Sequence, residues 1–160
     1  MIYIYRDGRA VAYSLWKSKY YNKDWGDLTF SEYLRKPLDW LGGPGQKRES
    51  EFNIAQHWYH HVDLWHKVKN KNLLILKYED LKSDPTDVYK QIVTKFFPFK
   101  RLKYALFKTM DDNKIDPVAD PVGLHPNKAE IDSYKSIFTE ADNDYFLSCL
   151  PCKKYLTDNS

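Results

Sequence analysis

Two short apolar runs, each bordered by polar residues, constrain the fold of this chain more than any other feature. The first covers residues 2–5 and leads directly into the turn Arg6-Asp7-Gly8. The second covers residues 73–76 and is expected to be a fully buried strand. With helices between and after them, the two runs predict a parallel α/β arrangement. Because a two-stranded parallel sheet is a poor core, we expect the chain to be a piece of a larger domain.

The clearest helix signal lies between the two runs. Apolar residues recur there at helical spacing, at Ala55, Trp58, Val62 and Trp65. We therefore expect the two tryptophans to be buried. Asp84-Pro85 is typical of a later helix start, with aspartate as N-cap and proline next. The stripe of that helix is predicted to comprise Val88, Ile92 and Phe96. Further helices are expected at residues 28–34 (capped near Thr29 or Ser31), 102–110, and from about Glu140, capped by Thr139, to Cys149.

Composition excludes several classes of protein. The chain has 160 residues, of which 42% are hydrophobic and 29% charged, so residues 1–160 are expected to form one globular domain. A net charge of +3 suits a phosphate-bearing small ligand and is too weak to indicate nucleic acid. No apolar run approaches the roughly 20 residues of a membrane span, and the first residues lack signal-peptide features. With only two cysteines, the sequence favours a cytoplasmic protein without a disulfide framework.

The turn after the first apolar run is a candidate anion site. In α/β folds, ligands bind beyond the carboxyl ends of strands, where a helix N-terminus offers N–H groups to an anion. Arg6 adds a guanidinium that can bind phosphate through two hydrogen bonds, and Ser14 adds a hydroxyl donor. The alternative is a surface arginine that pairs with Asp7, with the serine facing solvent. Spacing alone leaves both interpretations open.

Five motifs in the same order resemble the cytosolic-type sulfotransferase family and together span nearly all of the chain. They are Tyr5-Arg6-Asp7-x-x-x-Val11-x-x-Ser14, Trp58-x-x-His61-Val62-x-x-Trp65, Tyr78-Glu79-Asp80-Leu81, Phe107-x-x-Met110, and Phe138-Thr139 with Asn143 and Phe146. The resemblance implies a partial P-loop-like three-layer α/β/α fold with a short parallel sheet. It also implies transfer of a sulfuryl group from 3'-phosphoadenosine-5'-phosphosulfate (PAPS) to a hydroxyl or amine of a small-molecule acceptor.

The resemblance assigns cofactor-binding roles to five residues. Arg6 and Ser14 would hold the 3'-phosphate of PAPS. Tyr78 and Phe107 would lie against the adenine, since a purine needs only a π face to stack on. Lys128 is what remains of the family's later Arg-Lys-Gly phosphate triplet, because Asn127 and Ala129 stand beside it here. For Tyr78 and Phe107 the alternative is plain core packing.

Two parts of the family pattern have no counterpart in this sequence. The N-terminal phosphate loop, which grips the 5'-phosphosulfate, would precede residue 2, and the catalytic histidine would lie between that loop and the first strand. We therefore assign no catalytic residue and expect residues 1–160 alone to be inactive. Two alternatives remain, a non-catalytic nucleotide- or protein-binding module and a carbohydrate-type sulfotransferase. The family's dimer motif is also missing, which leaves the oligomeric state open.

Histidines and cysteines give weaker signals. His57 and His61 have the i, i+4 spacing of a metal pair, but no third ligand is evident, so no metal is expected. Cys149 and Cys152 form a Cys-x-x-Cys late in the chain, away from the strand-to-helix start of a redox fold. We interpret them as a chance pair.

Overall fold

The computed structural model describes residues 1–18, 28–38, 51–97 and 131–156. These residues belong to two compact units. The sheet unit comprises Met1–Tyr5 and Lys69–Ile131, and the helical unit comprises Arg6–Val68 and Asp132–Ser160. The expectation of a single domain stays a prediction, because two such units can belong to one domain.

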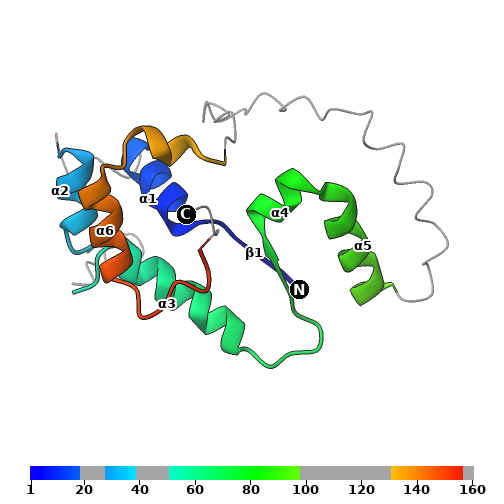
Figure 1. The fold of residues 1–160 in the computed structure, drawn as a ribbon. Helices are drawn as coiled ribbons and strands as arrows, with labels where there is room; N and C mark the ends of the chain where they lie inside the picture. The colour runs from blue at the N-terminus through cyan, green and yellow to red at the C-terminus, as the bar shows by residue number, and fades with distance from the viewer. Residues whose placement is uncertain (19–27, 39–50, 98–130, 157–160) are drawn as a thin grey trace. The chain divides into compact units, whose positions relative to one another are not determined.

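The sheet unit contains two parallel strands (Figure 1). Strand β1 (Ile2–Tyr5) pairs with β2 (Leu74–Lys77), with Ile2 opposite Leu74 and Tyr5 opposite Lys77. Helix α4 (Tyr78–Ser83) follows β2 directly. A single residue, Asp84, separates α4 from α5 (Pro85–Phe96). Both helices contact β2. The prediction of an α/β fold with a short parallel sheet is therefore confirmed.

The start of α5 follows the sequence signal. The Asp84 carboxylate accepts a hydrogen bond from the backbone N–H of Asp87, and Pro85 occupies the first helical position. Proline fits there because its missing N–H would have no partner within the helix. Of the predicted stripe, Val88 is buried, whereas Ile92 and Phe96 are only half-buried.

Two predictions for this unit need correction. The run at 73–76 was predicted to be fully buried, but only Leu73 and Leu76 are, while Leu74 and Ile75 are half-buried. In the described residues β2 pairs only with β1, so both are edge strands with less cover than central strands have. The second correction is α4, which was not among the helices predicted from the sequence.

The helical unit contains α1 (Gly8–Lys17), α2 (Phe30–Arg35), α3 (Ile54–Lys67), the 3₁₀ helix η2 (Ser133–Ser136) and α6 (Glu140–Ser148). Helix α1 contacts α2, α3 and η2, and α2 contacts α3 and α6 (Figure 1). The side chains of Thr29, Asn53 and Thr139 cap α2, α3 and α6. Thr29 thus proves to be the cap of α2, and the predicted cap and start of α6 are confirmed.

Trp65 departs from the predicted stripe of α3. Ala55, Trp58 and Val62 are buried as expected, but Trp65 is only half-buried. It lies in the last turn of the helix, which ends at Lys67. An indole ring is so large that it is rarely covered completely, above all near a helix end.

A buried carboxylate joins α2 to α6. Asp142 accepts hydrogen bonds from the hydroxyls of Ser31 at 2.7 Å and Thr139 at 2.8 Å, and from the Arg35 guanidinium at 2.6 Å. Burial alone would raise the pKa of Asp142, but these hydrogen bonds hold the pKa below its ordinary value. The ionised carboxylate thus has the partners that a buried charge requires.

Candidate functional site

The candidate site begins at the turn between β1 and α1. Asp7 is the N-cap of α1, and its carboxylate accepts a hydrogen bond from the backbone N–H of Arg9 at 2.9 Å. The side chain of Asp7 is therefore already placed at the positive end of the helix dipole. The backbone N–H of Arg9, in the first turn of α1, therefore already forms a hydrogen bond within the protein.

Arg9 is held against the same carboxylate. Its Nε donates to Asp7 Oδ1 at 3.0 Å and its Nη2 donates to Asp7 Oδ2 at 2.7 Å, so the two side chains form a bidentate pair. Nη1 also donates to Asn143 Oδ1 at 3.4 Å, and the guanidinium lies 5.0 Å from the ring centre of Tyr134. Burial alone would lower the pKa of Arg9, but the hydrogen bond and charge of Asp7 raise the pKa above its ordinary value. Arg9 is thus a structural cation that connects α1 to η2 and α6.

The main chain of Arg6 is fixed from α3. The indole Nε1 of Trp58 donates a hydrogen bond to the Arg6 carbonyl oxygen at 2.9 Å. Trp58 is buried and Arg6 is half-buried, so this hydrogen bond is partly removed from solvent. A hydrogen bond that is partly removed from solvent is stronger than one in water and holds the backbone from which the Arg6 side chain projects.

Gly8 allows this close approach. A β-carbon at Gly8 would lie 2.5 Å from Cδ2 of Trp58 and 2.8 Å from Cζ of Phe146. Both distances are far below van der Waals contact, and the two rings are themselves buried neighbours with centres 6.2 Å apart. Only a residue without a side chain fits at this position.

We expect Gly8→Ala to lower the free energy of unfolding. Alanine is the better helix former by about 1 kcal/mol, so helix propensity alone predicts stabilisation. Overpacking costs about 1–3 kcal/mol and acts in the opposite direction, so the sign of the change decides which effect dominates. Denaturant unfolding followed by tryptophan fluorescence measures it, since all five tryptophans lie between residues 6 and 68. Lys17→Ala, at an exposed position of α1, is the control and should change stability by less than about 0.5 kcal/mol.

The five predicted site residues have different places in the structure. Arg6 and Ser14 belong to the helical unit, and both are half-buried. Arg6 directly precedes the N-cap of α1, and Ser14 lies almost two turns into that helix. Tyr78 is the first residue of α4, in the sheet unit, and is half-buried. Phe107 and Lys128 lie outside the described residues, as does the helix predicted at 102–110.

Sequence reasoning missed the residues that support the turn. It assigned Trp58 to core packing and gave no role to Arg9 or Asn143. One sequence signal could have indicated a role for Trp58 and Asn143, because both belong to the motifs that resemble the sulfotransferase family. Their contacts with the turn span 52 and 134 residues of sequence, which no local pattern reveals.

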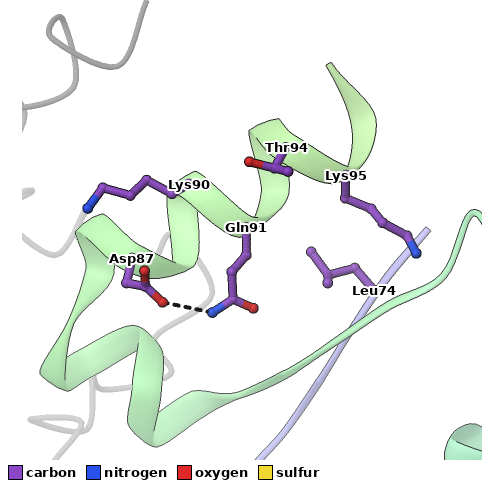
Figure 2. Close-up of a pocket in the computed structure, with 6 residues that line it drawn as sticks. All are labelled: Leu74, Asp87, Lys90, Gln91, Thr94 and Lys95. Carbon is purple, nitrogen blue, oxygen red and sulfur yellow. Dashed lines mark hydrogen bonds between the residues drawn. The ribbon is translucent and has the colours of Figure 1, made fainter. Parts of the chain in front are cut away.

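A hollow on the sheet unit lies elsewhere. It has a volume of about 570 Å³ and is lined by Leu74, Asp87, Lys90, Gln91, Thr94 and Lys95 (Figure 2). All but Leu74 come from α5, and the amide of Gln91 donates to the Asp87 carboxylate at 3.0 Å. Of the predicted site residues that the structure describes, Arg6, Ser14 and Tyr78 do not line this hollow.

The structure adds little to the weaker sequence signals. His57 is half-buried and His61 is exposed on α3. In the described part of the chain, no three histidine, cysteine, aspartate or glutamate side chains gather as a metal ion would require. Across the same residues, no helix has the length and apolar character needed to cross a membrane.

Comparison with known proteins gives one finding. No curated protein and no solved structure matches the chain. The family model described as "Sulfotransferase domain" matches residues 1–147, which is nearly the whole sequence. The match includes the Arg6 turn, the α3 motif and the first eight residues of α6. The chain therefore belongs to the sulfotransferase domain family.

Proposed function

We propose that this chain binds the adenosine 3'-phosphate part of PAPS for sulfuryl transfer, with Arg6 and Ser14 on the 3'-phosphate. The observation that carries the proposal is the fixed turn at Arg6, where the Trp58 hydrogen bond and the close packing at Gly8 hold the backbone. A side chain that projects from a fixed backbone has less conformational freedom to lose when it binds an anion. Arginine also matches the geometry of a phosphate better than lysine does.

Ser14 supports the same assignment through helix geometry. Ser14 lies six positions after Gly8, which places the serine about 9 Å along the helix axis. Side chains in an α-helix lean toward its N-terminus, so the Cα–Cβ bond of Ser14 tilts along the axis in the direction of the Arg6 turn. A hydroxyl donor and a guanidinium on one side of an anion make a suitable pair for phosphate.

Arg9 is a poor candidate for this role despite its closeness in sequence. Its guanidinium already bonds to Asp7 and Asn143, and Asp7 would repel a second anion. A phosphate there would have to displace a buried ion pair, which costs several kcal/mol. The proposal therefore assigns the phosphate to Arg6 and gives Arg9 the structural role.

The remaining assignments concern the adenine and the reaction. We assign Tyr78 and Phe107 to the adenine and Lys128 to the 3'-phosphate. In the transfer, the acceptor oxygen or nitrogen forms a bond to sulfur while the bond from sulfur to the 5'-phosphate oxygen breaks. The residues of this chain bind and orient the nucleotide, and positioning is a large part of the catalysis of such in-line transfers.

A comparison of two nucleotides tests the proposal. Isothermal titration should show that the chain binds adenosine 3',5'-bisphosphate more tightly than 5'-AMP, which lacks the 3'-phosphate. Arg6→Ala should remove most of this preference, a loss of about 1.5–3 kcal/mol or roughly 10- to 100-fold in Kd. Ser14→Ala should reduce it less, because the hydroxyl is uncharged.

Two controls make the result specific. Lys17→Ala removes an exposed positive charge from the same helix and should leave the preference unchanged. Circular dichroism should show that Arg6→Ala is folded. Equal affinities of the unmodified chain for the two nucleotides would contradict the assignment of Arg6 and Ser14.

A further inference from the structure

Two thiols follow one another at the end of α6. Cys149 is the C-cap of the helix and Cys152 lies three residues later; both are free and half-buried. The segment that carries them is anchored in the helical unit, because Tyr155 and Leu156 just beyond are buried. The thiols are therefore held in place and remain partly accessible.

Each thiol contacts a side chain near the start of α3. The amide Nδ2 of Asn53, the N-cap of α3, donates a hydrogen bond to Cys149 Sγ at 3.2 Å. The hydroxyl of Tyr59 lies 3.3 Å from Cys152 Sγ. The hydroxyl of Tyr145 also hydrogen-bonds to Cys149. A phenol therefore lies at both sulfurs, and the two sites differ in the Asn53 amide, which donates to Cys149.

The surroundings of Cys152 favour its thiolate. The hydrogen bond with Tyr59, then the backbone and the ammonium of Lys154, lower the pKa of Cys152 below its ordinary value, against the opposing charge of Asp63. The same contact raises the pKa of Tyr59 to about 12, so the phenol stays protonated at neutral pH and can donate to sulfur. A partly exposed thiolate stabilised in this way is typical of reactive cysteines.

We propose that Cys149 and Cys152 form a dithiol site that reacts with small disulfides, with Cys152 as the attacking thiolate and Cys149 as the resolving thiol. The Cys152 sulfur bonds to one sulfur of the disulfide, and the other sulfur leaves as a thiolate that takes up a proton. Cys149 then loses its proton and attacks the Cys152 sulfur, which releases the second small thiol. The protein is oxidised to a Cys149–Cys152 disulfide, and the small disulfide is reduced to two thiols. Sequence spacing alone predicts a chance pair; the contacts with α3 distinguish the two sulfurs.

Glutathione disulfide is the probe that tests this site. The protein is incubated with it at pH 7 and quenched with acid, and peptide mass spectrometry follows each cysteine. In Cys149→Ser, a stable mixed disulfide should accumulate on Cys152. In Cys152→Ser, adduct formation on Cys149 should be slower by at least about tenfold, since thiolate fraction governs the rate. The unmodified chain should end as the internal disulfide without a lasting adduct.

Tyr59→Phe isolates the hydrogen bond, because it removes only the hydroxyl. In the Cys149→Ser background it should slow adduct formation on Cys152 by at least about threefold. Tyr13→Phe is the matched control on α1 and should leave the rate unchanged, and circular dichroism should show both variants folded. Equal rates at the two cysteines, an unaltered rate in Tyr59→Phe, or a lasting Cys152 adduct in the unmodified chain would each overturn the proposal.

Discussion

Replacing Arg9 with alanine should lower the free energy of unfolding of the helical unit by about 3–5 kcal/mol, the cost of leaving a buried charge without its partner. The Asp7 side chain is only 2% exposed, and Arg9 is itself buried. The variant keeps the cap hydrogen bond from the backbone of residue 9 but removes both guanidinium bonds to Asp7. It also removes the bond to Asn143 that connects α1 to α6.

Arg35→Ala is the matched control for this prediction. Arg35 also pairs with a buried aspartate, Asp142, but its own side chain is 39% exposed. After the substitution, Asp142 keeps the hydroxyl hydrogen bonds from Ser31 and Thr139. We expect a smaller loss than for Arg9→Ala, because Arg35 is partly exposed and two hydroxyls still donate to the buried carboxylate.

Denaturant unfolding of the three proteins measures the difference. Adding Asp7→Asn to Arg9→Ala should recover part of the loss, because no charge then remains buried at this turn, and the amide can still accept the cap hydrogen bond. If Arg9→Ala costs no more than Arg35→Ala, the pair with Asp7 is not the structural link that its burial indicates.

The elements that sequence reasoning predicted well are those with local signals. Thr29, Asp84 and Thr139 each accept a hydrogen bond from the third backbone N–H beyond them, as the capping rule describes. Helix α4 was missed because that signal is lacking there. Its N-cap is Lys77, which makes no side-chain cap hydrogen bond, and the chain enters the helix directly from β2. Without a cap signal, Tyr78-Glu79-Asp80-Leu81 was identified only as a motif that resembles the family's, and no helix was predicted there.

The candidate site was only partly predictable for a different reason. Sequence placed Arg6 and Ser14 at a strand-to-helix turn, a position set by local order along the chain. It could not tell which arginine pairs with Asp7, and the alternative considered was Arg6. The structure pairs Asp7 with Arg9, which sits at the second helical position and can reach back to the N-cap. The further contacts to Asn143 and Tyr134 depend on how distant helices pack.

Trp58→Ala should also destabilise the helical unit by about 3–5 kcal/mol, the usual cost of truncating a large buried aromatic residue. Trp58 is 7% exposed, and its ring packs against Gly8 and Phe146. Truncation leaves a cavity at the start of α1 and removes the hydrogen bond to the Arg6 carbonyl. Trp65→Ala, in the same helix, is the control and should cost clearly less because that ring is only half-buried.

Trp58→Phe separates packing from positioning. Phenylalanine retains most of the ring but cannot donate to the Arg6 carbonyl, so the hydrogen bond alone should cost about 0.5–1.5 kcal/mol of stability. If that bond positions Arg6 for the 3'-phosphate, the variant should also lose affinity for adenosine 3',5'-bisphosphate while its affinity for 5'-AMP stays the same. Unfolding followed by circular dichroism and titration with both nucleotides give the two readouts. A variant that loses stability but keeps its full preference for the bisphosphate would assign Trp58 to packing alone.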